Sequence, residues 1–240
     1  MSMLLTGKCD ISIMCGRFSL LAHQEFLRER FMIDRFECSP DPQYNISPDQ
    51  KVSVILREKD GSRVMICMRW GLIPFWTENP NEPDYSPINV RAETIMEKRM
   101  FKYSFQKRRC LVPASGFYEW MGERGSKIPY YFHLKDRELF AFPGIYENWV
   151  SEDEQSRIYS VAFATTTPNQ TVERVHTRMP VILAEGEEVL WLDPEANESD
   201  LLELLDPYPD GDMTSYEVST YVNDPSNEGP LAIRHVEEKE

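Results

Sequence analysis

Hydrophobic and polar residues alternate along much of the chain with the period of two that is typical of strands in a half-buried sheet. Two such runs, at 51–58 and 62–72, are separated by a Lys-Asp-Gly-Ser stretch that predicts a hairpin turn. The other predicted strands lie at 110–120 (with a turn inside it), 127–134, 138–150, 157–168, 179–184 and 215–222.

Helical spacing of hydrophobic residues is confined to short segments. Clusters of proline, asparagine and aspartate at 39–50 and 74–87 predict two long ordered loops, and loops of that length are usually functional. Because helices and strands do not alternate regularly, we predict an α+β fold, a single mixed domain with an antiparallel β-sheet and flanking helices. The predicted helices lie at 22–33, 92–106, 168–176, 187–192 and 198–205.

Composition restricts the class of protein. The chain has 240 residues, 41% of them hydrophobic, and no run approaches the ~18 apolar residues of a membrane helix. Residues 1–13 lack the apolar stretch of a secretory signal, so we expect a cytoplasmic protein, nucleoid-associated if prokaryotic. We also expect a monomer without a membrane partner. The five cysteines contain no C-x-x-C pair, which favours buried thiols over a zinc site or a disulfide framework. No metal and no organic cofactor is expected.

Charge is distributed unevenly along the chain. The net charge of −14 arises in residues 185–240, which hold 17 acidic and 2 basic residues. Residues 1–184 hold 23 acidic and 24 basic residues, so they can form a local basic face. We interpret the acidic quarter as solvated surface that ends in an acidic tail at 225–240.

Cys15 is the first candidate reactive group. It follows Met14, which looks like a translation start, although thirteen residues precede that methionine. Loss of those residues and of Met14 would give Cys15 an α-amine beside its thiol. Such a 1,2-aminothiol reacts with an aldehyde to form an imine, which the thiol then closes into a thiazolidine ring. The alternative is an inert buried cysteine.

Three further polar residues have settings that suit catalysis. Glu119 lies in an apolar segment between aromatic residues, where desolvation would raise its pKa. His176 lies in a loop beside an arginine, and Asn89 begins a segment of alternating polar residues ahead of a predicted helix. Each also has a structural interpretation. Glu119 could be an exposed carboxylate, His176 a structural histidine whose hydrogen bonds are satisfied, and Asn89 part of a solvated polar face.

Seven motifs in a fixed order resemble those of the SOS-response-associated peptidase (SRAP) family, the abasic-site-processing proteins. Any one of them is weak, but the ordered set is specific, and it implies an SRAP domain with a barrel-like core at 14–224. The motifs are Met-Cys-Gly-Arg-Phe at 14–18, Tyr-Asn-Ile-Ser-Pro at 44–48, Trp-Gly-Leu-Ile-Pro at 70–74, Asn-Val-Arg-Ala-Glu at 89–93, Arg-Met-Phe at 99–101, Arg-Cys-Leu-Val-Pro-Ala-Ser-Gly-Phe-Tyr-Glu-Trp at 109–120 and His-Thr-Arg-Met-Pro at 176–180.

The resemblance implies a function in the DNA damage response. Family members recognise abasic sites in single-stranded DNA and crosslink to the opened sugar as a thiazolidine, a lyase-like activity, and the family name also records a peptidase. By match, Cys15 would be the nucleophile and Asn89 would position its amine and the sugar. Glu119 would transfer protons, with assistance from His176.

An abasic site offers no base to read, so the partner, single-stranded DNA, must be held through its phosphates and neighbouring bases. Guanidinium groups suit phosphate oxygens, and indole rings can stack on bases, although core packing is the alternative for each tryptophan. The expected DNA-binding residues are Arg17, Arg91 and Arg178 for phosphates, Trp70 and Trp76 for stacking, and Asn45.

Residues 1–13 depart from the family pattern, in which the chain begins at the Met-Cys. Either translation starts at Met14, or a true leader is cleaved ahead of Cys15, with autoproteolysis as one route. Two other functions stay open on the sequence alone. One is a cysteine peptidase for protein substrates, with Cys15 and His176 as nucleophile and base. The other is a non-catalytic single-strand-binding module, whose DNA affinity would depend on salt and not on the lesion.

Overall fold

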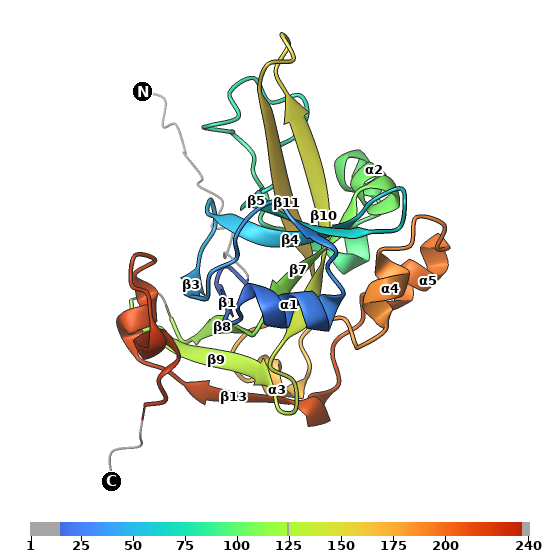
Figure 1. Cartoon of the computed structure of the whole chain (residues 1–240). Helices are drawn as coiled ribbons and strands as arrows, with labels where there is room; N and C mark the ends of the chain where they lie inside the picture. Colours follow the sequence, from blue (N-terminus) through green and yellow to red (C-terminus); the bar gives the residue numbers. More distant parts are fainter. Residues whose placement is uncertain (1–14, 124, 237–240) are drawn as a thin grey trace, which may run out of the picture.

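The computed structural model describes residues 15–123 and 125–236 (Figure 1). The expected leader at 1–13 and residues 237–240 of the expected acidic tail lie outside these ranges. Within them, strands predominate and short helices flank them, which confirms the predicted α+β fold. No helix of the described ranges is both long enough and apolar enough to cross a membrane.

A closed ring of five strands forms the centre of the fold. The hairpin of β4 (Lys51–Arg57) and β5 (Arg63–Trp70) is joined through β4 to β7 (Arg109–Ala114). β7 pairs with β10 (Phe140–Val150), β10 pairs with β11 (Arg157–Thr166), and β11 returns to β5. Only the closing β11–β5 pair of the ring is parallel. The ring is the barrel-like core that the family resemblance implied.

Three short strands extend the ring, and five more form a second sheet. β2 (Arg35–Phe36) lies parallel to β5, while β6 (Asn89–Arg91) and β12 (Met179–Pro180) pair with β11. The second sheet is antiparallel throughout. Its order is β13 (Met213–Glu217), β9 (Ile128–Leu134), β8 (Gly116–Met121), β1 (Phe18–Leu20) and β3 (Gln43–Ile46).

A single residue carries the chain from the ring into the second sheet. β7 ends at Ala114 and β8 begins at Gly116, so Ser115 alone connects them. Gly116 is required by packing, because a Cβ there would lie 2.3 Å from the ring of Tyr131. This passage sets the position of the rest of β8, including Glu119, relative to the barrel.

The helices are shorter than their hydrophobic spacing predicts. The predicted helix at 92–106 is divided, because Lys98 has an extended backbone between a 3₁₀ turn at Ala92–Thr94 and α2. The predicted strand at 179–184 is reduced to β12, and the one at 215–222 ends in a 3₁₀ turn at Thr220–Asn223. The helices are α1 (Gln24–Phe31), α2 (Arg99–Lys107), α3 (Gln170–Glu173), α4 (Glu187–Trp191) and α5 (Glu198–Glu203).

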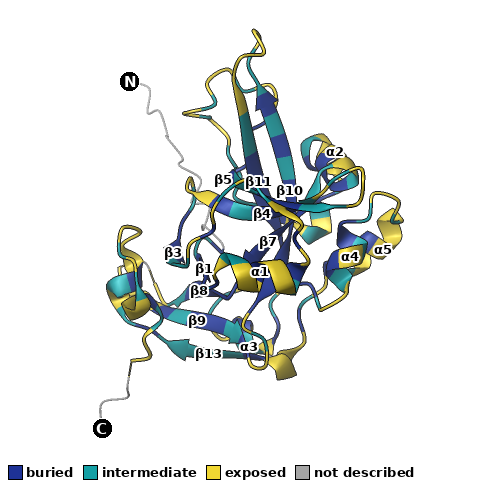
Figure 2. Cartoon of the chain, viewed as in Figure 1, coloured by how far each residue is buried: buried dark blue, intermediate teal, exposed yellow. Residues whose placement is uncertain are grey.

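The barrel interior is filled by aromatic rings. Phe163 stacks on Trp70 at 5.2 Å and on Phe142 at 4.6 Å between ring centroids, and Phe18 meets all three edge-on. Figure 2 shows buried residues gathered along β7, β10 and β11. Contacts of this kind add to the stabilisation from the area that each ring buries, so they help to hold the ring of strands together.

Residues 225–236, expected as part of an acidic tail, are folded onto β3. The Glu228 carboxylate accepts the backbone N–H groups of Tyr44 and Asn45 at 2.9 and 3.0 Å. A 3₁₀ turn at Pro230–Ile233 buries Ala232 completely, and His235 bridges to Val218. Glu228, an acidic residue of this segment, therefore has a structural role and is not simply a solvated surface charge.

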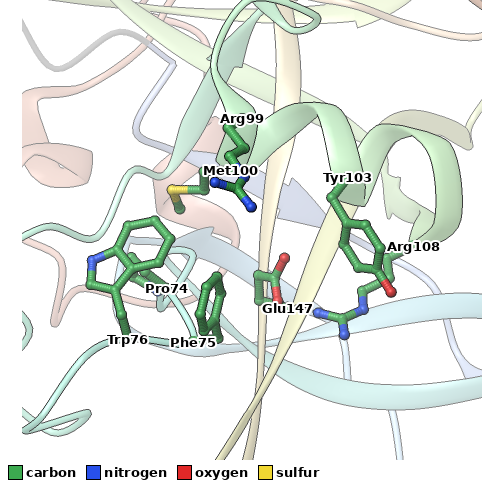
Figure 3. A pocket seen from close by; sticks show the side chains of 8 residues that line it. All are labelled: Pro74, Phe75, Trp76, Arg99, Met100, Tyr103, Arg108 and Glu147. Carbon is green, nitrogen blue, oxygen red and sulfur yellow. Dashed lines mark hydrogen bonds and ion pairs between the residues drawn. The ribbon is translucent and has the colours of Figure 1, made fainter.

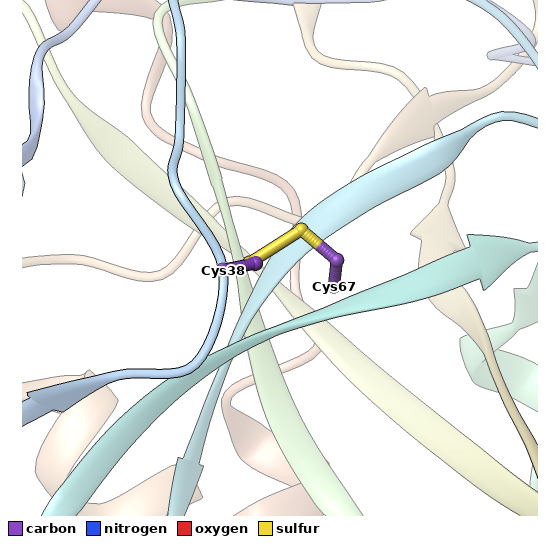
Figure 4. The surroundings of a disulfide bond; sticks show 2 residues. All are labelled: Cys38 and Cys67. Carbon is purple, nitrogen blue, oxygen red and sulfur yellow. A yellow bond between two sulfur atoms is a disulfide. The ribbon is translucent and has the colours of Figure 1, made fainter.

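Cys38 and Cys67 form a disulfide, which makes the expectation of free buried thiols wrong for this pair (Figure 4). The two cysteines are 29 residues apart in sequence, with Cα atoms 5.9 Å apart. The cause is the register of β2 on β5, in which Phe36 lies opposite Met65, so that two residues further on Cys38 meets Cys67. Among the described cysteines, Cys15 and Cys110 are buried free thiols, as expected.

We expect Cys38→Ser to lower the free energy of unfolding by about 3–4 kcal/mol under oxidising conditions, from the chain entropy of the closed loop. Urea denaturation of oxidised protein measures the difference. Adding reductant should lower the stability of the wild-type chain toward that of the variant and leave the variant unchanged. Equal stabilities without reductant would show that the bond does not stabilise the folded chain.

Candidate active site around Cys15

Cys15 lies at the start of the described chain, just ahead of β1, with its backbone nitrogen against a carboxylate. The nitrogen donates a hydrogen bond of 2.7 Å to Oε1 of Glu119, 104 residues away in sequence. The side chain is buried, at 2% exposure. Its φ of 44° is in the left-handed region that non-glycine residues rarely adopt, so the backbone at Cys15 is strained.

The pairing of β1 with β8 brings Glu119 to this nitrogen. Phe18 lies opposite Phe117, and the Tyr118 N–H donates to the carbonyl of Arg17 at 2.9 Å. Because the strands are antiparallel, moving back from Phe18 along one strand corresponds to moving forward from Phe117 along the other. Glu119 therefore faces the residues that precede β1.

Glu119 is a buried carboxyl, 3% exposed, and burial raises its pKa above the usual range. Nε2 of His176 lies 3.9 Å from Oε2 and opposes that increase, as does the hydrogen bond from Cys15. The sequence prediction of a desolvated carboxyl is therefore confirmed, and the alternative of an exposed edge-strand residue is wrong. A buried carboxyl of raised pKa can both accept and return a proton more readily than an exposed one.

His176 and Asn89 complete a group of four polar residues. His176 follows α3, and its Nδ1 lies 3.2 Å from both the backbone nitrogen and the carbonyl oxygen of Arg178, which leaves Nε2 facing Glu119. Asn89 opens β6, which pairs in parallel with β11. Its Nδ2 donates to the carbonyl oxygen of Cys15 at 3.4 Å. The structure thus brings together all four residues that the sequence analysis selected as catalytic candidates.

The Cys15 thiol is protonated in this setting. Burial raises its pKa well above the usual value, and the neighbouring Glu119 carboxylate raises it further, while Arg178 acts in the opposite direction. A thiol of this kind is a poor first nucleophile, because the thiolate is the reactive form. Both the backbone nitrogen and the thiol of Cys15 contact the Glu119 carboxyl, the nitrogen at 2.7 Å.

The expected phosphate-binding arginines differ in how accessible they are. Arg91 is exposed on β6. Arg17 is half-buried and donates to the Asn45 side chain and the Val222 carbonyl, both at 2.7 Å. Arg178 is 8% exposed and pairs with both carboxylate oxygens of Glu93. Phosphate binding by all three stays a prediction, and of the three, only Arg91 has an exposed side chain.

Asn45 is a correction to the sequence analysis, because its side chain is inaccessible to DNA. It is completely buried, and its Nδ2 donates to backbone carbonyls of Asp224 and Asn227 at 2.9 and 2.7 Å. With Glu228, it attaches the C-terminal segment to β3. The Tyr-Asn-Ile-Ser-Pro motif therefore has a structural role at this position.

Comparison with known sequences identifies the family. Residues 14–225 match the family described as SOS response associated peptidase (SRAP). The chain belongs to the SRAP family. The match begins at Met14, immediately before the cysteine of the cluster described above.

Relatives from bacteria to vertebrates align with most of this SRAP chain. The abasic site processing protein YoqW of Bacillus subtilis (strain 168) is 41% identical over 224 residues, which is 92% of this chain and 99% of that protein. The abasic site processing protein HMCES of Xenopus tropicalis is 33% identical over 79% of this chain and 64% of its own length. A solved structure from Bacteroides thetaiotaomicron has a TM-score of 0.83 at 28% identity, covering 92% of this chain and all of that one.

Of the two tryptophans expected to stack on bases in this SRAP chain, Trp70 is in the core. It is completely buried, and its Nε1 donates to the Ile88 carbonyl at 2.9 Å, so the expectation of stacking is wrong. Its alternative, core packing, is correct, because the last residue of β5 points into the barrel. Trp76 is 56% exposed in the loop after β5 and packs edge-to-face on Phe75, which is 72% exposed.

We expect Trp70→Ala to lower the free energy of unfolding by about 3–5 kcal/mol, since it leaves a cavity in the barrel. Trp76→Ala is the matched control and should change the stability by less than about 1 kcal/mol. Urea denaturation of both variants tests the assignment. A similar loss in both variants, or a stable Trp70→Ala chain, would contradict the burial described here.

The sequence analysis did not select three side chains that the structure points to, two at the Cys15 site and Phe75 in the loop after β5. Lys127, ahead of β9, acts electrostatically on Glu119, and Glu93 holds Arg178. Neither pairing has a local signal, because each joins segments that meet only in the folded sheet. Phe75 had one usable signal, its position beside Trp76 in a proline-rich loop.

Proposed function

We propose that this protein captures abasic sites in single-stranded DNA by forming a covalent thiazolidine through Cys15, and so shields the lesion in the DNA damage response. The observation that carries the proposal is the 2.7 Å hydrogen bond from the Cys15 nitrogen to the raised-pKa carboxyl of Glu119, in a chain of the SRAP family. The relatives named as abasic site processing proteins support the choice of lesion.

The reaction needs the Cys15 nitrogen as a free amine. Once the preceding residues are removed, an α-ammonium group stands where the amide now donates to Glu119, and the carboxylate can take its proton. The neutral amine adds to C1′ of the opened sugar, and loss of water gives an imine. The thiol then adds across the C=N bond, with its proton passing to nitrogen, and the five-membered ring closes. One water leaves in the overall condensation.

The other two residues have supporting roles in this proposal. Asn89 contacts the Cys15 carbonyl, so it can fix the terminal residue while the amine reacts. His176 lies 3.9 Å from Glu119 and can exchange protons with it during sugar opening and during reversal of the crosslink. We propose that Arg17, Arg91 and Arg178 bind the phosphates of the strand and that Trp76 stacks on a base next to the abasic site. We also propose that the protein acts as a monomer in the cytoplasm.

Removal of residues 1–14 is part of the proposal, either because translation begins at Met14 or because a leader is cleaved. The strained φ of Cys15 exists only while an acyl group is attached to its nitrogen, so removal of Met14 relieves that strain. An autoproteolytic step at this bond would account for the peptidase in the family name. The same site is poorly suited to cleaving other proteins, because the Cys15 thiol is buried, its pKa is raised, and His176 faces Glu119.

The test compares a chain that begins at Cys15 with a chain that keeps residues 1–14, in which the Cys15 nitrogen is blocked as an amide. Each is incubated with a single strand carrying one abasic site, and with the same strand intact, and products are separated on a denaturing gel. We expect a shifted band only for the first chain with the abasic strand. Equal non-covalent affinity for intact and abasic strands, without any shifted band, would favour a simple single-strand-binding module instead.

A further inference from the structure

A pocket of about 650 Å³ lies between the loop after β5 and helix α2 (Figure 3). None of the four residues of the Cys15 site lines it. Pro74, Phe75 and Trp76 line it from the loop, and Met100 and Tyr103 line it from α2. Phe75 is 72% exposed and Tyr103 is 53% exposed, which is unusual for large rings that already have a cavity between them. The walls are therefore open aromatic surfaces that a flat ligand can cover.

The floor of the pocket is polar. Glu147 of β10 lines it and is 3% exposed. Its carboxylate accepts hydrogen bonds from the Ser104 hydroxyl and from Arg108, and the Arg108 guanidinium lies 5.0 Å from the centre of the Tyr103 ring. Glu147 is already satisfied by these two partners, whereas the Arg108 guanidinium keeps further N–H donors that match the acceptors on the edge of a nucleobase.

Basic residues lie on and near the rim of the pocket. Residues 98–109 contain six lysines and arginines and no acidic residue, although Lys107 and Arg109 line a different pocket. Arg99 lines the pocket, and Lys98 and Lys102 are exposed on and beside α2. Positive charge around an aromatic slot is complementary to a phosphate attached to a base. An acidic peptide would match the charge but would leave the aromatic walls without a flat partner.

We infer that this pocket holds one unpaired nucleobase of the same strand that carries the abasic site, with the adjoining phosphates on Arg99 and Lys102. The inference rests on the proposed function. Glu147 pairs with Ser160 of β11 and Asn89 pairs with Phe163, so one residue of the pocket and one residue of the Cys15 site pair with β11 positions about 10 Å apart along the strand. A short length of single strand spans that separation. The pocket would fix how the strand is threaded past Cys15.

The experiment places 2-aminopurine, a fluorescent base, at each position in turn on both sides of the abasic site. The strand is crosslinked to the chain that begins at Cys15, and its emission is compared with that of free strand. We expect one position to differ sharply from the rest, and Tyr103→Ala to remove that difference. Phe26→Ala, an exposed aromatic residue on α1, is the matched control and should leave it in place.

The second measurement deletes the base. A stable abasic spacer replaces the nucleotide at the position identified, in a strand that cannot crosslink. Binding by the wild-type chain should weaken roughly tenfold, while binding by Tyr103→Ala, already weakened by a similar factor, should not fall further. Filling the pocket with Met100→Trp should act like Tyr103→Ala.

Two results would overturn the inference while the proposed function survives. One is a wild-type chain that crosslinks normally, with the same emission at every position and no effect of the spacer. The other is normal DNA behaviour by Tyr103→Ala together with lost binding of an acidic protein, which would make α2 a protein-binding surface. Absence of any crosslink from the wild-type chain would overturn the proposed function and this inference together, and the same gel shows it.

Discussion

A chain that begins at Cys15 and carries Cys15→Ala is expected to give no covalent product with an abasic single strand, a loss below the detection limit of a denaturing gel. The variant keeps the α-amine beside Glu119 but lacks the sulfur that closes the ring. An imine alone hydrolyses, so it is expected to appear only when borohydride is added to reduce it. Cys15→Ser should behave in the same way, since a hydroxyl closes the ring much less readily than a thiol.

Two controls make the result specific. Cys110→Ala removes the other described free thiol, which is buried in β7 and distant from Cys15 in sequence, and should leave crosslinking intact. The wild-type chain with residues 1–14 retained should give no product, because an amide nitrogen cannot form an imine. A stable crosslink made by that longer chain, with its mass showing Met1 still attached, would refute the assigned chemistry.

Glu119→Gln is expected to slow crosslinking by roughly 10²–10⁴-fold, the range that a positioned general acid–base group supplies. Glutamine has the same shape and can still accept the hydrogen bond from the Cys15 nitrogen, but it cannot take up a proton. A time course at saturating DNA measures the rate. His176→Gln should have a smaller effect, since the histidine reaches the reacting atoms only through Glu119. A rate unchanged by Glu119→Gln would remove the carboxyl from the mechanism.

The same substitution has a separate effect on stability that depends on pH. Burial raises the pKa of Glu119 in the folded chain above its unfolded value, so the folded state binds this proton more tightly. The resulting stability is fully present below the unfolded pKa of about 4.3 and is lost as the pH rises through the folded pKa. In the chain that keeps residues 1–14, Glu119→Gln should therefore be more stable than wild type at pH 8, and the difference should shrink toward pH 4. Urea denaturation at both values tests the sign.

Local signals in the sequence were enough for the elements whose partners are close by. The hairpin of β4 and β5 follows from alternating residues on both sides of Asp60-Gly61, and the turn between β7 and β8 follows from Ser115-Gly116. The four residues of the Cys15 site, including Cys15 itself, were found because each belongs to a motif of the SRAP set. No periodicity in the sequence places Glu119 against a nitrogen 104 residues away.

What the sequence could not supply depends on register between distant strands. The Cys38–Cys67 bond exists because β2 lies on β5 in one alignment, and a shift by one residue would separate the sulfurs. Trp70 and Trp76 occur in one short segment, yet one is in the core and the other is on the surface. Trp70 is buried because it is the last residue of β5, whereas Trp76 lies in the loop that follows. Sequence arguments locate strand ends poorly, so they could not separate the two tryptophans.

A chain that holds both this disulfide and the proposed nucleophile Cys15 places two demands on the redox conditions of its buffer. Dithiothreitol added to keep the terminal sulfhydryl from oxidising also acts on the bridge between β5 and the loop after β2. Omitting it preserves the bridge and exposes the nucleophile to disulfide exchange with other molecules. Buffers poised at an intermediate glutathione ratio are the setting in which both sulfur centres can be kept in their working states, and comparisons between preparations should hold that ratio constant.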